Sequence, residues 1–235
     1  MAVPASADGG QPPSPSEVGS ELERLHARIR ACTLCGLHAT RTRAVPGSGR
    51  VPAEVMIVGE APGFNEDVKG LPFVGPAGRL LDTLLRQIGL SREEVYITNV
   101  LKCRPPQNRD PMPHEAEACL PYLRLQFKLV QPKAVLVLGR HALERMLPGV
   151  GPISRVHGQI FVRSGVAFMP CYHPAAALHN AALLDDLQKD FDRVREYLDR
   201  LLGEERAEPE EAAVEPGPEP TDPEPPPEAE QLSLI

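Results

Sequence analysis

Four of the five cysteines form the first chemically informative pattern of this chain. Cys32 and Cys35 enclose two residues, and 67 residues later Cys103 and Cys119 enclose fifteen. No secretion-signal pattern opens the chain, so we expect reduced thiols, and four gathered thiols are better metal ligands than disulfide partners. Soft thiolates select zinc or an iron–sulfur cluster, and spacing does not choose between them. The alternative is unrelated buried thiols, which is our prediction for Cys171 in its apolar run.

Apolar periodicity predicts the elements that must position these residues. Short runs that are apolar throughout indicate buried strands, and apolar residues three or four apart indicate helices. Where the two alternate, a parallel sheet covered on both faces is expected. The predicted strands are 54–58, 95–101, 134–138, 159–162 and 166–169, and the predicted helices are 17–30, 78–90, 113 to just before Pro132, 140–147 and 181–202.

Three segments of unlike sequence are expected to meet at one edge of this sheet. Residues 59–63, 99–104 and 172–180 each follow or end a predicted strand. Ligands of parallel sheets lie beyond the carboxyl ends of the strands. The sequence therefore predicts one crevice built from these three segments.

Composition bounds the folded domain to residues 17–203. Residues 1–16 have no apolar period, and residues 204–230 contain eight prolines and eleven acids, so we expect both segments to be disordered. The net charge of -7 is the sum of a charge of -10 on residues 204–230 and a charge of +3 on the rest of the chain. A mildly basic domain of this kind suits a nucleic-acid binder. No apolar run approaches the ~20 residues that span a bilayer. We therefore expect a cytoplasmic protein that is not bound to a membrane.

Four motifs follow one another between residues 20 and 202: GEAPGFNED at 59–67, LPFVG at 71–75, ITNVLKCRPP at 97–106 and HPAA at 173–176. With the cysteines, they resemble the iron–sulfur uracil-DNA glycosylases, family 4 of that superfamily. The resemblance implies a three-layer α/β/α sandwich with a central, mostly parallel sheet. It also implies one [4Fe-4S] cluster on Cys32, Cys35, Cys103 and Cys119, and removal of uracil from DNA by a bacterial, nucleoid-associated monomer that starts base excision repair.

The resemblance assigns three side chains to a pocket for a base flipped out of the stack. Phe73 offers a flat apolar face for stacking. The Asn99 amide has an acceptor and a donor that match the O4/N3 edge of uracil, and cytosine would leave both mispaired. His173 would donate a hydrogen bond to O2, where charge develops on bond cleavage. On their own, these residues also suit a core aromatic, a turn cap and a core histidine.

The loop at 59–63 is implied to line the uracil pocket through Glu60, Ala61 and Pro62. Better-known glycosylases of the superfamily place an aspartate where this chain has Ala61 or Pro62. The carboxylates left to orient a water are Glu60 and Glu66, and Glu66 alternatively excludes the methyl group of thymine.

Four residues are expected to contact DNA. Lys102, Arg104 and Arg109 are candidates for phosphate pairing, with a solvated basic loop as the alternative. Leu178 resembles the wedge that fills the space left by the flipped base. The family often has an arginine after this leucine, where this chain has His179.

The terminal pentapeptide Gln231–Ile235 resembles the binding motif for the bacterial sliding clamp, although the last position of that motif is more often phenylalanine. A short apolar plug on a disordered linker is suited to docking in a groove. The alternative is a chance apolar terminus.

Two other functions compete with uracil excision. One is a metal-bearing DNA-binding module that has lost catalysis and serves a replication or repair complex. The other is a superfamily member that attaches covalently to the abasic product through a histidine in an inserted basic loop. No such insertion follows Cys103 and Arg104.

Overall fold

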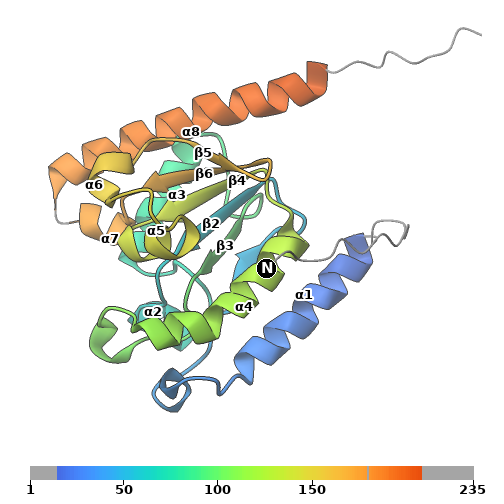
Figure 1. Cartoon of the computed structure of the whole chain (residues 1–235), viewed down its shortest axis with the longest axis vertical. Coiled ribbons are helices and arrows are strands. Elements are labelled where there is room, and N and C mark those ends of the chain that lie inside the picture. Colours follow the sequence, from blue (N-terminus) through green and yellow to red (C-terminus); the bar gives the residue numbers. More distant parts are fainter. Residues whose placement is uncertain (1–14, 179, 208–235) are drawn as a thin grey trace, which may run out of the picture. The chain divides into compact units, whose positions relative to one another are not determined.

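The computed structural model describes residues 15–178 and 180–207 (Figure 1). The chain divides into two compact units, Met1–Asp199 and Arg200–Ile235. The motifs and the cysteines all fall in the first unit. The predicted clamp motif, His179 and most of both predicted disordered ends lie outside the described residues.

A six-stranded sheet forms the centre of the first unit, with the strand order β1-β3-β2-β4-β6-β5. The inner four strands run parallel, and the two edge strands pair antiparallel with their neighbours. The strands are β1 Ser48–Gly49, β2 Val55–Gly59, β3 Tyr96–Asn99, β4 Ala134–Leu138, β5 Phe161–Arg163 and β6 Val166–Cys171.

Helices cover both faces of this sheet (Figure 1). In β2, Met56 and Val58 face the core shared with one group of helices, whereas Val55 and Ile57 face the other core, as the alternation of strand side chains requires. The first group is α1 Pro15–Arg30, α4 Pro113–Val130 and α5 Arg140–Met146, and the second is α3 Pro76–Gln87 and α8 Ala181–Ala207. The three-layer α/β/α fold is therefore confirmed.

Short elements occupy the loops at the carboxyl edge of the sheet. They are η1 Gly36–Ala39, α2 Phe64–Lys69, η2 Pro106–Asn108, α6 Ile153–Val156 and α7 Pro174–Ala177. The periodicity missed them because a helix of three to six residues is too short to show a period. It also missed β1, a two-residue edge strand.

The long elements agree with the predictions to within a few residues. Within the described residues, α1 begins at Pro15 and α8 extends to Ala207, slightly beyond the predicted domain on both sides. None of the helices in this part of the chain combines the length and the apolar character needed to cross a membrane.

Candidate functional site

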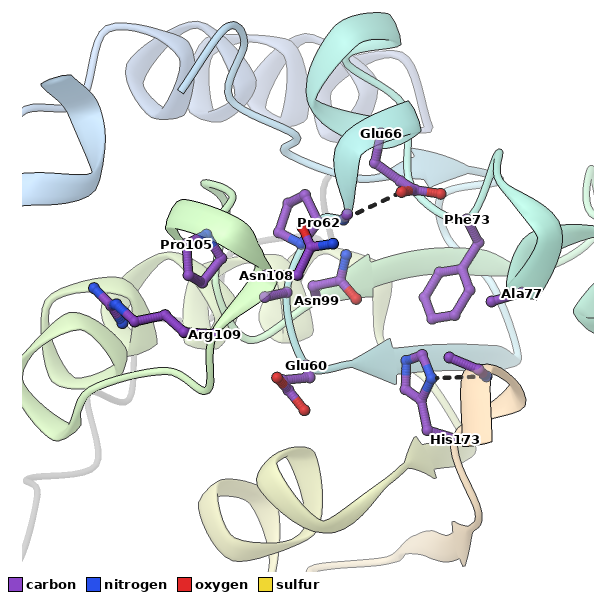
Figure 2. Close-up of a pocket in the computed structure, with 13 residues that line it drawn as sticks. Glu60, Pro62, Glu66, Phe73, Ala77, Asn99, Pro105, Asn108, Arg109 and His173 are labelled. Carbon is purple, nitrogen blue, oxygen red and sulfur yellow. Dashed lines mark hydrogen bonds between the residues drawn. The ribbon is translucent and has the colours of Figure 1, made fainter. Parts of the chain in front are cut away.

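A cavity of about 260 Å³ lies at the carboxyl edge of the sheet (Figure 2). It joins the three segments at the strand ends that were expected to meet there, so the predicted convergence is confirmed. Its walls are Glu60, Ala61, Pro62, Gly63, Glu66, Phe73, Ala77, Asn99, Pro105, Asn108, Arg109, His173 and Ala175.

Asn99 is the last residue of β3 and presents its amide to this cavity. The residue is 2 % exposed, and its Oδ1 has no hydrogen-bond partner within the described residues. Gly59 pairs with Asn99 across the sheet, and a Cβ there would lie 2.4 Å from Oδ1 and 2.6 Å from the Phe73 ring. Glycine is therefore needed at residue 59. A buried acceptor without a partner costs about 1–3 kcal/mol, which a ligand N–H would recover.

Phe73 forms the apolar wall, and its backbone is held in an unusual conformation. Its φ is +51°, a region that costs a non-glycine residue about 1–2 kcal/mol. Arg92 donates hydrogen bonds to the carbonyl oxygens of Pro72 at 2.9 Å and Phe73 at 2.6 Å. A Cβ at Gly78 would lie 1.8 Å from the Phe73 carbonyl oxygen. These contacts aim the ring at the cavity, where its centroid lies 5.6 Å from that of His173.

His173 follows β6 and caps α7. Its Nδ1 accepts a hydrogen bond from the Ala175 N–H at 3.1 Å (Figure 2). In the neutral ring the proton is therefore on Nε2, which becomes the donor. Burial lowers the pKa of His173 to about 4, so the ring is neutral at pH 7.

The Glu66 carboxylate joins two walls of the cavity. Its Oε1 accepts the N–H groups of Val74 and Gly75, both at 2.8 Å, and its Oε2 accepts the N–H of Gly63 at 3.1 Å. Both oxygens are therefore occupied by backbone donors. The side chain holds the 59–63 loop against the loop that carries Phe73.

Glu60 is the second carboxylate of the cavity, and its oxygens are available. Within the described part of the chain it accepts no hydrogen bond, and its Oε2 lies 4.0 Å from Nε2 of His141. The same Nε2 lies 3.3 Å from Asp110 Oδ1. Burial raises the pKa of Glu60, and the nearby His141 opposes that shift.

The four predicted cysteine ligands line one small cavity between α1, α4 and the loop after β3. Cys103 Sγ accepts a hydrogen bond from Arg41 at 3.0 Å, and Cys32 Sγ accepts one from the Leu34 N–H at 3.5 Å. Hydrogen bonds and positive charge of this kind suit an anionic sulfur site. Cys171 is fully buried in β6, as predicted.

The distances between the thiols bear on the two metal groups that the sequence left open. Within the described residues, the ligand atoms that all lie within 4.8 Å of one another are those of Glu60, Asp110 and His141, and the cysteines form no such group. A single tetrahedral zinc ion, with Zn–S bonds of about 2.3 Å, would hold its sulfurs roughly 3.8 Å apart. Among the described residues, the cysteine thiols therefore do not have the spacing of a single zinc site.

Lys102 does not have the surface position expected of a DNA contact. It is 1 % exposed, and its Nζ donates to Thr98 Oγ1 at 2.7 Å and to the Asn99 carbonyl at 2.6 Å. The predicted phosphate contact of Lys102 is therefore wrong. The sequence showed a lysine in a basic stretch, whereas the tertiary contacts place its ammonium between Asn99 and the cysteine cavity.

The other predicted DNA contacts are at least partly exposed. The Arg104 guanidinium lies 5.3 Å from the centroid of the exposed Phe64 ring and donates to Asn108 Oδ1 at 2.7 Å. Arg109 lines the cavity, and its two terminal nitrogens bind Glu115 at 2.9 and 2.6 Å. Leu178 is 41 % exposed at the end of α7.

The sequence reasoning missed several residues of the site. Ala77, Pro105, Asn108 and Ala175 line the cavity, and His141 lies beside Glu60. His141 was detectable, because it follows the predicted strand 134–138 at the same carboxyl edge. Ala77 lies in the first turn of α3, and the others lie in or next to the short helices η2 and α7, which no periodicity marks.

Comparisons with known proteins identify relatives over most of the chain. The family model described as the uracil DNA glycosylase superfamily matches residues 46–201. The type-4 uracil-DNA glycosylase of Sulfurisphaera tokodaii is 46% identical over 184 residues, 74% of this chain and 84% of the relative. The enzymes of the same name from Saccharolobus solfataricus and Archaeoglobus fulgidus are 44% identical over 186 residues and 46% over 183 residues. These matches cover 75% and 74% of this chain, and 86% and 92% of the relatives.

Proposed function

The chain belongs to the uracil DNA glycosylase superfamily, and from this premise we propose that it removes uracil from DNA. It hydrolyses the N-glycosidic bond of a flipped deoxyuridine and leaves an abasic site for base excision repair. The observation that carries the proposal is the buried, unpartnered Oδ1 of Asn99 in a cavity that Phe73 and His173 also line. A module that had lost catalysis would have no use for this costly arrangement.

Asn99 is the residue proposed to select uracil. Its Oδ1 accepts the N3–H of the base, and its amide N–H₂ donates to O4. Cytosine presents an acceptor at N3 and a donor at N4, so both contacts become repulsive. A buried site with unpaired polar groups discriminates strongly between such bases. Phe73 stacks on the base, and the backbone of Glu60, Ala61 and Pro62 forms the wall beside it.

His173 is proposed to stabilise the leaving base. Cleavage of the glycosidic bond transfers negative charge to uracil, and a hydrogen bond to O2 becomes stronger as that charge grows. The Ala175 N–H keeps Nδ1 as an acceptor, which leaves Nε2–H as the donor. A neutral ring with a low pKa makes this donation without protonating the base.

Glu60 is proposed to orient the attacking water. Of the two candidate carboxylates, Glu66 uses its oxygens on three backbone N–H groups, whereas those of Glu60 remain available to a water. Glu66 then acts by positioning Phe73 and the 59–63 loop. Water is the nucleophile, because no lysine lines the cavity within the described residues and Lys102 is buried behind Asn99. The enzyme is therefore monofunctional.

Cys32, Cys35, Cys103 and Cys119 are proposed to hold one [4Fe-4S] cluster. Their shared cavity, the Arg41 and Leu34 donors and the spacing of the thiols support this assignment. When bound, the cluster supplies a rigid link between the loop after α1, the loop after β3 and α4. Metal binding removes the thiol protons, because thiolates are the ligands.

Excision of uracil from an oligonucleotide tests the proposal directly. The purified protein should convert uracil-containing DNA to a product that breaks only after alkali, and Asn99→Ala should lower the single-turnover rate by at least about 100-fold. His173→Gln should show a loss of about 10²–10³-fold. A wild-type protein that binds the DNA but releases no uracil would instead support the non-catalytic DNA-binding module.

For the C-terminal segment, residues 204–235, we make a separate proposal that rests on sequence alone. Residues 204–230 act as an acidic, proline-rich linker, and Gln231–Ile235 binds the bacterial sliding clamp. The enzyme acts as a monomer in the cytoplasm. Removal of residues 231–235 should abolish clamp binding in a pull-down and leave uracil excision unchanged. Clamp affinity that survives the deletion contradicts this role.

A further inference from the structure

A third cavity, of about 600 Å³, lies beside the cysteine cavity and has a strongly basic lining. Its charged side chains are Arg30, Arg41, Arg43 and Lys69, joined by His38, and no acidic residue lines it. Four cations around one cavity repel each other, and this repulsion does not stabilise the fold. The arrangement suits a bound anion.

Arg43 and Lys69 are the cations left for that anion. Arg30 pairs with Glu23 at 2.7 Å, and Arg41 donates to Cys103 Sγ at 3.0 Å and to the Arg30 carbonyl at 2.8 Å. Within the described residues, the exposed side chains of Arg43 and Lys69 have neither an ion pair nor a hydrogen bond. Both guanidinium and ammonium groups are therefore available to a ligand from solvent.

A buried carboxylate holds the two segments of this cavity together. Asp67 of α2 is 3 % exposed, and its Oδ1 accepts the N–H groups of Thr42 at 2.9 Å and Arg43 at 3.3 Å. The loop that carries Arg43 is thereby fixed against the helix that carries Lys69. The backbone that carries Arg43 and Lys69 is therefore ordered before a ligand binds, and a ligand does not have to bring the two side chains together.

Helix α2 connects this basic cavity with the cavity of Asn99. Gly63 and Glu66 at its start line the uracil cavity, and Lys69 and Gly70 at its end line the basic one. Six helical residues span about 9 Å, which corresponds to roughly two or three nucleotides along one strand of duplex DNA. Between the two ends, Phe64 and Val68 are four residues apart and 60 % and 44 % exposed, so an apolar face accompanies the path.

We propose that the basic cavity binds the phosphodiester backbone of the uracil-containing strand, two or three nucleotides from the flipped base. The proposal rests on uracil-DNA being the substrate, and it adds the residues that track the strand: Arg43 and Lys69, with Asp67 as their anchor. It also replaces the wrongly assigned Lys102 as the source of a phosphate contact in this part of the enzyme.

Salt-dependent binding tests the phosphate contact. Arg43→Gln and Lys69→Gln are compared with Arg86→Gln, an exposed arginine in the last turn of α3, on a duplex whose deoxyuridine carries a 2′-fluorine that resists hydrolysis. Each of the first two changes should lower the slope of log affinity against log salt by about one, and the Arg86 change should not. The excision rate at saturating DNA should stay within about twofold of wild type for all three, and thermal melting should confirm folding.

Neutral methylphosphonate links, placed singly one to four positions on either side of the uracil, locate the contact. Wild type should lose affinity at one or two neighbouring positions, and the Arg43→Gln/Lys69→Gln double variant should lose nothing more at those positions. Unchanged salt slopes would overturn the proposal. If inorganic phosphate nevertheless bound in the basic cavity, the cavity would be a site for a free anion and not for the DNA backbone. A wild type that releases no uracil, with slopes that change as expected, would refute the excision proposal but leave this one standing.

Discussion

At the scale of the residue, the candidate site depends on atoms that approach one another more closely than most side chains allow. Asn99 reaches the cavity only because residue 59 lacks a Cβ, and Phe73 is turned inward only because residue 78 also lacks one. The backbone carbonyl groups of both residues accept hydrogen bonds: Lys102 donates to the Asn99 carbonyl, and Arg92 donates to the Phe73 carbonyl. The proposed recognition of uracil therefore needs residues that never touch the base.

Replacement of Gly59 tests this dependence. Gly59→Ala places a methyl group 2.4 Å from Asn99 Oδ1, so Asn99 or Phe73 has to move, and a displacement of about 1 Å costs on the order of 100-fold in rate. We expect a single-turnover excision rate at least about 100-fold lower in a folded protein. Gly19→Ala, with nothing within 4 Å of the added Cβ, is the matched control and should behave as wild type.

The two carboxylates of the site should respond differently to amide substitution. Glu66→Gln turns an acceptor that serves backbone N–H groups into a partial donor, so we expect lower thermal stability together with slower excision. Glu60→Gln disturbs no hydrogen bond within the described residues and should slow excision without lowering the melting temperature. Loss of stability in Glu60→Gln, or none in Glu66→Gln, would reverse the assignment of roles.

At the scale of the element, buried polar contacts attach the helices to the sheet. His26 of α1 lies 2.9 Å from the Tyr96 hydroxyl of β3, and Gln126 of α4 donates to the same hydroxyl at 2.9 Å. Gln126 also donates to the Pro46 carbonyl, which the Thr98 hydroxyl reaches as well. The face of the sheet that supports the cysteine cavity is thus specified by polar contacts in addition to apolar packing.

Two histidines predict how stability depends on pH. Burial lowers the pKa of His26 and of His173 to about 4, compared with about 6.5 in an unfolded chain. The unfolded state therefore binds more protons between pH 6.5 and pH 4, and the free energy of unfolding should fall as the pH is lowered through that window. Urea denaturation at a series of pH values measures the slope. In His26→Gln the slope should decrease by up to one proton, and an unchanged slope contradicts the burial of this ring.

At the scale of the whole molecule, the cysteine cavity and the basic cavity share structural elements. The cysteines come from the loop after α1, the loop after β3 and α4, and Arg41 lines both the cysteine cavity and the basic cavity. Lys102 lies between the cysteines and Asn99. A metal group on the cysteines would therefore order segments that reach the base pocket and the proposed strand path.

Removal of the iron that we propose for the cysteines tests that connection. Chelation should raise hydrogen exchange in residues 31–44 and 101–104, because the link between them is lost, while β4 and β6 should keep their protection. DNA affinity should fall together with the rise in exchange. Equal protection with and without iron would mean that the metal does not order these loops.

The long elements and their approximate bounds were predictable from the sequence, and so were the residues that meet at the strand ends. Strand β4 was predicted at its observed bounds, because an apolar run between turns is a local signal. The convergence of Asn99 and His173 followed from the general position of ligands in parallel sheets. The short helix α2 was not predictable, although it connects the two cavities.

What the sequence determined by itself is the fold class, the family and the main residues of the base cavity, Phe73, Asn99 and His173, because periodicity and motif order are properties of neighbouring residues. The tertiary structure alone decided which charges are available. Lys102 is buried, Glu66 is occupied by backbone N–H groups, and the backbone of the exposed Arg43 is held by Asp67, 24 residues away in the chain. Burial and hydrogen bonding arise between segments distant in sequence, so no local pattern distinguishes an exposed lysine from a buried one.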